Sequence, residues 1–343
     1  MDDAKVRNME EFAAVCGISR PTLSKYFQDP GSVRASTRER IEAALERHDF
    51  RPNLYAVNQN RRHSKAIGIV VPYLADPFFA ELARNIETLV IDAGFRPILL
   101  SAHGDPAHEA DILDGLRDLK PAGVLLAPLG RASDRRAVEA FCAAVPTVLF
   151  DSNLVGQAEA FIGSDNDQSI ALIVDHLCDT GEPPAFFEMA SPVNPNAFKR
   201  REAYAAAMAR RGHAPMTLQV EGRGWDFEAI GRAGALKAIE ARALPSDTIL
   251  CSNDRLAVGF LSAAYEKGLR VGVGAGCALR VAGHDDHPYA RFASPRLTTV
   301  SQDYAAISRA SAAALLNLID TGRRAGRRET TLFAGRLVRR ESA

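Results

Sequence analysis

The sequence predicts a small all-α head followed by a larger α/β body built of two lobes. Three observations predict this division. The first 50 residues hold three short helical patterns, residues 66–283 alternate short apolar runs with amphipathic helices, and positive charge is concentrated near the start of the chain. The length of 343 residues suits two or three domains, and the hydrophobic fraction of 47% supplies enough apolar side chains for a buried core.

The composition excludes several classes of protein. No apolar run approaches the ~20 residues that cross a bilayer. The first residues, MDDAKVRNMEEF, contain acids and lack the apolar segment of a secretory signal. The five cysteines lie far apart without a C-x-x-C pair, which argues against a disulfide framework and a zinc site. We therefore expect a cytoplasmic protein with reduced thiols, no membrane association and no metal or other cofactor.

Charge is distributed unevenly along the chain. Residues 1–65 contain 12 basic and 9 acidic side chains, so the head carries a net charge of +3 and the remainder −3, although the whole chain is neutral. Clustered cations attract phosphate backbones, so a basic head favours a nucleic-acid partner. A solvated face that binds nothing is the alternative.

The first two helices of the head are joined by a tight turn. Residues 9–15 have apolar positions at helical spacing, and Gly17 ends this helix because glycine tolerates the positive φ of a turn. Ser19 caps the second helix, and Pro21 lies in its first turn, where no backbone donor is needed. Leu23 and Phe27 would face the core, which leaves polar side chains of this helix available to a partner.

The third helix completes a helix-turn-helix pattern. Residues 36–39, Ser-Thr-Arg-Glu, predict a capping box that starts a helix through Arg47, with a buried stripe of Ile41, Ala44 and Leu45. Three short helices with one solvent-exposed polar face are typical of a DNA-binding domain whose second helix enters a major groove. A three-helix module with a purely structural role has the same spacing.

The head resembles that of the LacI/GalR family of bacterial transcription regulators. The similarity lies in residues 12–19 (FAAVCGIS), 22–25 (TLSK), Val33, 37–41 (TRERI) and 50–56 (FRPNLYA). It implies that Arg20, Pro21 and Lys25 reach base edges, and that Ser19, Thr22, Ser24, Gln28 and Thr37 lie near phosphates or bases. Because Arg and Lys suit guanine O6 and N7, we expect at least one G·C pair per half-site.

The segment after the head departs from the family pattern. In the family, the residues after Pro-Asn form a hinge helix on operator DNA, which implies DNA contacts for Asn53 and Ala56. A leucine usually wedges into the minor groove at the position that Gln59 occupies here. Glutamine cannot unstack bases as an apolar wedge does, but it can donate to adenine N3 or thymine O2.

The body alternates strands and helices, which is typical of parallel sheets covered by helices on both faces. Because so many strands would crowd one open sheet, we expect two lobes that divide near residues 163–167. The predicted strands are 66–71, 97–101, 123–127, 147–151, 185–189, 217–220, 248–251 and 279–283, and the predicted helices are 78–93, 108–119, 134–145, 168–180, 197–211, 226–240 and 254–266.

Motifs throughout the body extend the family resemblance to essentially the whole chain. They are residues 76–79 (DPFF), 165–166 (DN), 176–177 (HL), 253–259 (NDRLAVG), 283–286 (GHDD), 295–300 (PRLTTV) and 337–342 (LVRRES). The resemblance implies a two-lobed, periplasmic-binding-protein-like sensor. The expected domains are a head at 1–50, a hinge at 51–65 and a sensor at 66–343, with an N-lobe of about 66–164 and 299–328 and a C-lobe of about 165–298 and 329–343.

A ligand cleft is expected where strands of the two lobes end. By family position, its candidate ligand-binding residues are Asp76, Phe78, Asp151, Arg200, Trp225, Asn253 and Asp285. Carboxylates with an Asn/Arg pair can bridge vicinal hydroxyls, and Trp225 offers an apolar face to a sugar ring. The acid-rich set favours a sugar or sugar-like polyol over a nucleobase. Each residue also has a structural alternative, such as helix capping for Asp76.

The sequence offers little support for an enzymatic function. Residues 284–287, His-Asp-Asp-His, lack the helical spacing of known zinc motifs, and neither a phosphate-binding loop nor a nucleophile elbow occurs. The sequence therefore predicts no catalytic residue. It predicts a homodimeric repressor that binds a pseudo-palindromic operator under control of a small ligand, and it leaves two alternatives: a nucleobase-type corepressor, or a sugar-binding transport module without a DNA role.

Overall fold

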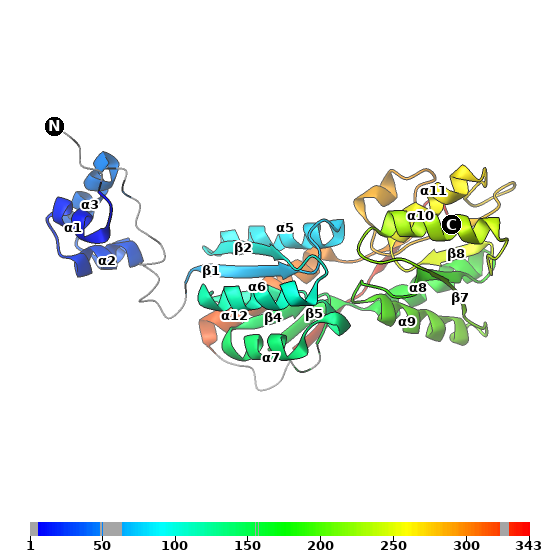
Figure 1. Cartoon of the computed structure of the whole chain (residues 1–343), viewed down its shortest axis with the longest axis horizontal. Coiled ribbons are helices and arrows are strands. Elements are labelled where there is room, and N and C mark those ends of the chain that lie inside the picture. Colours follow the sequence, from blue (N-terminus) through cyan, green and yellow to red (C-terminus); the bar gives the residue numbers. More distant parts are fainter. Residues whose placement is uncertain (1–5, 49, 51–63, 155, 157, 323–328) are drawn as a thin grey trace. The chain divides into compact units, whose positions relative to one another are not determined.

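The computed structural model describes residues 6–48, 50, 64–154, 156, 158–322 and 329–343. The chain divides into two compact units, Met1–Ser64 and Lys65–Ala343, which are described separately. Figure 1 shows the helices of the first unit and the two lobes of the second.

The first unit is a three-helix head. Its helices are α1 (Met9–Cys16), α2 (Arg20–Gln28) and α3 (Ala35–His48), with a 3-10 turn η1 (Pro30–Ser32) after α2. Gly17 ends α1 with φ of 60°, and Ser19 caps α2, as the sequence predicts. The head's core is small and apolar, and it is formed by Phe12, Ala13, Cys16, Leu23, Tyr26, Ile41, Ala44 and Phe50.

The predicted capping box at residues 36–39 is wrong. Helix α3 begins at Ala35, and the amides of Thr37 and Arg38 both donate to the carbonyl of Arg34, so Ser36 lies inside the first turn. Helix α3 is held against the turn that follows α1. The Arg40 guanidinium donates to the Cys16 carbonyl at 2.7 Å and to the Gly17 carbonyl at 3.0 Å.

The second unit begins with the N-lobe, a six-stranded parallel sheet of order β11-β5-β4-β3-β1-β2. Its strands are β1 (Ala66–Val71), β2 (Arg96–Ser101), β3 (Gly123–Leu126), β4 (Thr147–Phe150), β5 (Ala160–Ser164) and β11 (Glu329–Phe333). One face packs against α5 (Pro77–Asp92) and α12 (Tyr304–Thr321), and the other packs against α6 (Pro106–Asp118) and α7 (Arg135–Ala144), beside the short turn η2 (Gly130–Ala132).

The C-lobe is a four-stranded parallel sheet of order β7-β6-β8-β9. Its strands are β6 (Ala185–Met189), β7 (Met216–Val220), β8 (Thr248–Cys251) and β9 (Arg280–Ala282). Helices α8 (Asn166–Thr180) and α9 (Ala197–Arg210) cover one face, and α10 (Phe227–Glu240) and α11 (Asp254–Glu266) cover the other (Figure 1). The turn η3 (Pro288–Arg291) follows β9.

The chain passes between the lobes three times, and the three crossings are hydrogen-bonded to one another. The Asp165 amide of the first crossing donates to the Phe333 carbonyl of the third at 2.9 Å. The side chain of Gln168 exchanges two bonds with Gly335, at 2.8 and 3.2 Å. A short antiparallel pair, β10 (Thr299–Ser301) with β12 (Arg336–Val338), joins the second and third crossings.

The α/β architecture is confirmed, and each predicted element of the body ends within about two residues of its observed end. One boundary between the lobes is wrong. Residues 329–333 were expected in the C-lobe, but they form β11 and pair in parallel with β5 in the N-lobe sheet. The edge of β5 offers unpaired backbone groups that this returning segment satisfies.

Candidate functional site

In the head, the polar side chains predicted to meet DNA lie mainly along α2. Ser19, Arg20, Pro21 and Lys25 are exposed, and Thr22, Ser24 and Thr37 are half-buried. The Ser19 hydroxyl lies 2.8 Å from that of Thr22, and Arg20 forms an exposed ion pair with Glu10 at 3.3 Å. The side chain of Gln28, and the whole of Asn53, Ala56 and Gln59, lie outside the described residues.

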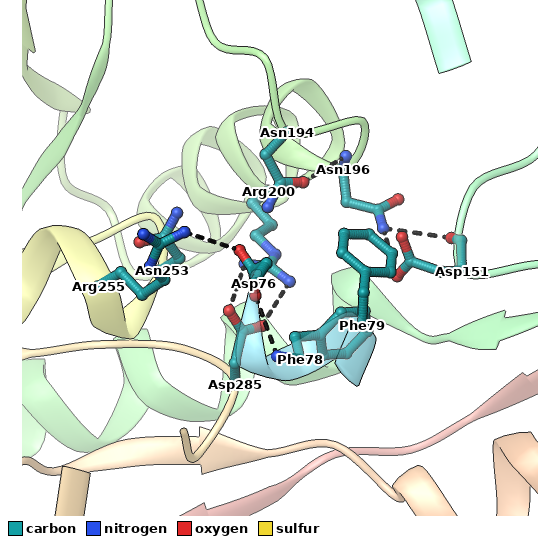
Figure 2. A pocket seen from close by; sticks show the side chains of 10 residues that line it. All are labelled: Asp76, Phe78, Phe79, Asp151, Asn194, Asn196, Arg200, Asn253, Arg255 and Asp285. Atoms are coloured by element: carbon teal, nitrogen blue, oxygen red, sulfur yellow. Dashed lines mark hydrogen bonds and ion pairs between the residues drawn. The ribbon is translucent and has the colours of Figure 1, made fainter. Parts of the chain in front are cut away.

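In the body, a pocket lies between the two lobes, and six of the seven predicted ligand-binding residues line it. About 300 Å³ of space lies between its walls, counting the opening to solvent. Figure 2 shows the ten lining side chains, which are Asp76, Phe78, Phe79, Asp151, Asn194, Asn196, Arg200, Asn253, Arg255 and Asp285.

Strand ends bring the acidic and amide groups together. Asp76 follows β1 and caps α5, accepting from the Phe78 amide at 3.0 Å. Asn253 follows β8 and caps α11, accepting from the Leu256 amide at 2.8 Å. The alternative capping role of Asp76 is therefore real, but its second oxygen still faces the pocket. Because parallel strands end at one edge of each sheet, residues distant in sequence meet in the cleft.

The two remaining strand-end acids have strained backbones. Asp151 follows β4 with φ of 59°, and Asp285 follows β9 with φ of 124°. Both values lie in the region that favours glycine, and such conformations cost about 1–3 kcal/mol each. Hydrogen bonds hold them in place: the Asp151 amide donates to the Ile162 carbonyl, and the Asp285 amide donates to the Val300 carbonyl, each at 2.9 Å.

Arg200 and Asp285 form a buried ion pair at the base of the pocket. Arg200 Nη2 donates to Asp285 Oδ1 at 2.7 Å, and Gln302 Nε2 donates to the same oxygen at 2.7 Å. Although burial opposes ionisation, the Arg200 charge and the hydrogen bond from His284 lower the pKa of Asp285 to about 2. Burial, together with the Arg200 charge, lowers the pKa of His284 to about 4, so this imidazole is neutral at pH 7.

The Asp285 network reaches the crossings between the lobes. Gln302, which donates to Asp285, also accepts from the Ser164 hydroxyl at the end of β5. Tyr304, at the start of α12, donates its hydroxyl to the Asp285 carbonyl at 2.7 Å. Two of the three crossings are therefore one or two hydrogen bonds away from a pocket carboxylate.

A second arginine, Arg255, bridges the two lobes inside the pocket. It makes a bidentate pair with Glu228 of α10, at 2.8 and 2.6 Å, and donates to Asp76 of the N-lobe at 3.1 Å. Burial raises the pKa of Asp76, and the charge of Arg255 counteracts part of this rise. The guanidinium also lies 5.0 Å from the centre of the Phe227 ring, a favourable cation–π distance.

Asp151 lies on the other side of the pocket (Figure 2) and has a different environment. Its side chain accepts from the Asn196 amide of the C-lobe at 2.9 Å. The Asn196 side-chain oxygen accepts in turn from Lys199 Nζ at 3.0 Å. Burial raises the pKa of Asp151 to about 7, and the charges of Arg200 and Lys199 only partly counteract this rise.

Trp225 does not line the pocket. The residue is 6% exposed, and its indole stacks on Tyr73 with ring centres 5.1 Å apart and an interplanar angle of 10°. It also meets Phe79 and Phe227 edge-on, at 6.1 and 5.6 Å. Because Tyr73 follows β1 and Trp225 follows β7, the stack joins the N-lobe to the C-lobe beside the pocket.

Four lining residues are not among the predicted ligand-binding residues: Phe79, Asn194, Asn196 and Arg255. The repeated asparagines in Val-Asn-Pro-Asn, just before α9, were the available signal, since Asn favours turns and helix caps near ligand loops. The sequence around Arg255 does not indicate that this residue lines a pocket. A cation in the first turn of a helix usually faces solvent, and its partners Glu228 and Asp76 are far away in the sequence.

The His-Asp-Asp-His segment at 284–287 is occupied by internal contacts. His284 bonds Asp285 at 3.0 Å, Asp286 pairs with Arg340 at 2.6 Å, and the His287 amide donates to Asp254 at 2.7 Å. Among the described residues, no group of three or more His, Cys, Asp or Glu side chains is arranged to hold a metal ion. None of the helices within the described ranges combines the length and the apolar character of a membrane-spanning segment.

Family comparisons match both units of the chain. Residues 8–53 match the family described as bacterial regulatory proteins, lacI family. Residues 169–343, half of the chain, match the periplasmic binding protein-like domain.

Individual relatives cover most of the chain. It is 27% identical over 302 residues to the ribose operon repressor of Escherichia coli (strain K12), covering 86% of this chain and 87% of that protein. The fold matches the Lac repressor dimer bound to operator and the anti-inducer ONPF, with a TM-score of 0.83, 24% identity, and coverage of 98% and 99%. It also matches a LacI family transcriptional regulator from Enterococcus faecium with bound ribose, with a TM-score of 0.68, 21% identity, and coverage of 81% and 98%.

Proposed function

Because the chain belongs to the lacI family of bacterial regulatory proteins, we propose that it is a homodimeric repressor whose affinity for operator DNA is controlled by a sugar bound between the two lobes. Family membership makes it a transcription regulator and not an enzyme. The homodimer, the sugar ligand and the coupling between the pocket and the DNA-binding head are the proposed properties.

The DNA part of the proposal is supported by the exposed face of α2. Arg20 and Lys25 project cations from a short helix whose other face is anchored by Leu23 in the core of the head. A guanidinium or ammonium on such a helix can donate to guanine O6 and N7 in a major groove. Two heads in a symmetric dimer would then read a pseudo-palindrome, with at least one G·C pair in each half-site.

The assembly is proposed to form through helix α5 and the adjoining C-lobe surface. On α5, Ile91 is 54% exposed, and Arg84 and Thr88 face outward beside it. A two-fold contact along this helix would place the N-lobes against each other, so a change between lobes would alter the spacing of the two heads.

The ligand part is supported by the donor and acceptor set of the pocket. Three aspartates and three asparagines can bridge several hydroxyls, and Phe78 and Phe79 supply apolar contact. A sugar is favoured over a nucleobase because Trp225, the large aromatic platform a base would use, is already stacked on Tyr73. The name of the ribose operon repressor, and the ribose bound to the E. faecium protein, agree with a small sugar.

One observation supports the coupling: hydrogen bonds connect the pocket to the crossings. A ligand that competes for Asp285 changes the acceptor available to Gln302, which contacts Ser164 at the first crossing. It also competes for interlobe contacts such as Asp76 with Arg255. The ligand would thereby alter the angle between the lobes, and through the dimer it would decide whether the two heads can bind the operator together.

A gel-shift titration tests the whole proposal. Purified protein should select duplex fragments from its own chromosome, with an affinity that falls steeply as salt rises, because phosphate contacts release counterions. Addition of the sugar should change this affinity. Indifference to every fragment, with or without sugars, would contradict the repressor function, and binding without salt dependence would contradict contact led by phosphates.

The single tryptophan offers an independent readout of the sensor. Trp225 of the C-lobe stacks on Tyr73 of the N-lobe. A sugar that changes the angle between the lobes should therefore change the fluorescence emission of Trp225 without any DNA present. Tyr73→Leu, which removes the stacked ring, should alter the emission of the ligand-free protein and serves as the matched control. Unchanged fluorescence during a titration that releases DNA would exclude Trp225 from the conformational change.

A further inference from the structure

The charges that line the pocket are not balanced equally on its two sides, and this inequality has consequences for the ligand. On one side, Arg200 uses all three guanidinium nitrogens within the protein. Nε donates to Asn166 at 3.2 Å, Nη1 to the Ser252 carbonyl at 2.7 Å, and Nη2 to Asp285 at 2.7 Å. No nitrogen of this fork is left without a protein acceptor.

Arg255 is equally committed. Its Nε and Nη2 bind the two oxygens of Glu228, and its Nη1 binds Asp76. A phosphate or carboxylate on a ligand is normally held by an arginine fork that is free to pair with it. Here both forks already pair with carboxylates of the protein, so an anionic ligand would have to displace an internal partner.

Asp151 is the carboxylate that lacks a cationic partner among the described pocket residues. Its side chain accepts from the neutral Asn196 amide, and the nearby Lys199 ammonium donates to Asn196 instead of to Asp151. A carboxylate has about four lone-pair positions, so Asp151 retains room for further donors. Burial raises the pKa of this group to about 7, in agreement with its poor compensation.

The charge count follows from these contacts. Asp76, Asp151, Glu228 and Asp285 supply four carboxylates around two guanidiniums, and Lys199 is a further cation near Asp151. Sugar hydroxyls can donate to Asp151 and relieve its desolvation. An ionised phosphate or carboxylate offers only acceptors, and above pH 7, where Asp151 is ionised, it would meet this side chain as a like charge in a buried site.

We propose that the cleft selects uncharged sugars and rejects sugar phosphates and sugar acids, with Asp151 as the residue that determines this specificity. The inference rests on the proposed sugar-binding function and narrows it: the signal is a free sugar, before any step that phosphorylates or oxidises it. Asp76, Asp285 and the two arginines position the ligand without discriminating by charge, because they neutralise one another.

Binding measurements on the full-length protein with matched ligand pairs test this inference. The pairs are glucose with glucuronate, galactose with galacturonate, and ribose with ribose 5-phosphate, measured at pH 8 by thermal shift and calorimetry. A uronate replaces a hydroxymethyl group by a carboxylate of similar size, so it separates charge from bulk. In every pair of which either member binds, the free sugar should bind at least tenfold more tightly than its anionic counterpart.

Two variants show whether the discrimination comes from Asp151. Asp151→Asn keeps the shape of the side chain and removes its charge, so it should reduce the preference for the free sugar by about tenfold, mainly through tighter binding of the anion. Asp111→Asn makes the same change on the exposed face of α6 and should leave the preference unaltered. The wild-type comparison needs no variant, so it decides the matter even if Asp151→Asn folds poorly.

The outcomes separate this inference from the function on which it rests. A sugar phosphate or uronate that binds as tightly as its free sugar would overturn the specificity and leave the sugar-controlled repressor intact. An unchanged preference in Asp151→Asn would overturn the role of Asp151. If no ligand of either kind shifts the melting temperature while operator binding is normal, the sugar ligand itself is wrong, and the specificity fails with it.

Discussion

In the head, the Arg20 side chain is 63% exposed and has Glu10 at 3.3 Å, whereas in the pocket the Arg200 side chain is 3% exposed and has Asp285 at 2.7 Å. Both are pairs of an arginine with a carboxylate, but burial gives the two arginines different roles. An exposed ion pair contributes little to stability and leaves the cation free for DNA, while a buried one must stay paired because an isolated charge is costly there. Substitutions in the two regions should therefore affect different properties.

The largest effect is expected when the buried pair is broken. Arg200→Ala leaves Asp285 as an uncompensated buried carboxylate, so it should lower the free energy of unfolding by about 3–5 kcal/mol. Chemical denaturation followed by circular dichroism measures this change. The control Arg117→Ala removes a half-exposed partner of Asp114 and should stay within about 0.5 kcal/mol of wild type. Equal small effects would show that burial does not distinguish these arginines.

In the head, the same kind of substitution should have the opposite pattern. Arg20→Ala should weaken operator binding by about 1–3 kcal/mol and change the free energy of unfolding by less than about 0.5 kcal/mol. Gel shifts at several salt concentrations, with a parallel thermal melt, measure both quantities. Arg47→Ala, an exposed change on α3, is the control for lost charge. Loss of stability without loss of affinity would assign Arg20 a structural role.

The comparison also shows how far the sequence determines the site. Local pattern predicts the strands and helices because each is an apolar run or an amphipathic stripe of sufficient length. It missed strands β5, β10, β11 and β12, and it missed helix α12, although the alanine-rich helical pattern of α12 was readable. Strand β11 depends on the free edge of β5, which no local pattern reveals.

The pocket was predictable in part for a topological reason. Acidic and amide residues at the ends of parallel strands must meet, so Asp76, Asp151, Asn253 and Asp285 could be proposed from their positions. The sequence does not reveal which charged side chains of the pocket pair with one another. The contact of Arg255 with Asp76 spans 179 positions, and it decides which carboxylates are neutralised. Trp225 was misplaced for a similar reason, since Tyr73 as a stacking partner is visible only in three dimensions.

Within the pocket, a smaller effect should appear as a pH dependence. The pKa of Asp151 rises from 3.8 to about 7 on burial, so the folded state holds a proton between these values that the unfolded state has lost. Its stabilising contribution is therefore present below about pH 4 and is lost as the pH rises through 7. Relative to wild type, ligand-free Asp151→Asn should gain about 1–2 kcal/mol in the free energy of unfolding between pH 6 and pH 8.

The difference between the two proteins isolates Asp151 from groups of opposite sign. Burial lowers the pKa of His284 to about 4, so the unfolded state binds the extra proton between about pH 4 and 6.5, and stability rises with pH there. This contribution is common to wild type and Asp151→Asn and cancels in the comparison. Parallel stability curves for the two proteins would mean that Asp151 ionises normally, with its charge compensated in the fold.

The smallest effect is expected in the segment that links the two regions. Gln59 lies outside the described residues, at the position where the family resemblance implies a leucine that wedges between base pairs. Gln59→Leu should tighten operator binding by about threefold, because an apolar side chain can unstack the central step and a glutamine cannot. The gain should be greater on operators with a flexible TA centre than on those with a stiff A-tract. Gln59→Ala, which lacks the wedge, should show no such preference in the same gel shifts, and an unchanged affinity for Gln59→Leu on both operators would show that this position does not enter the minor groove here.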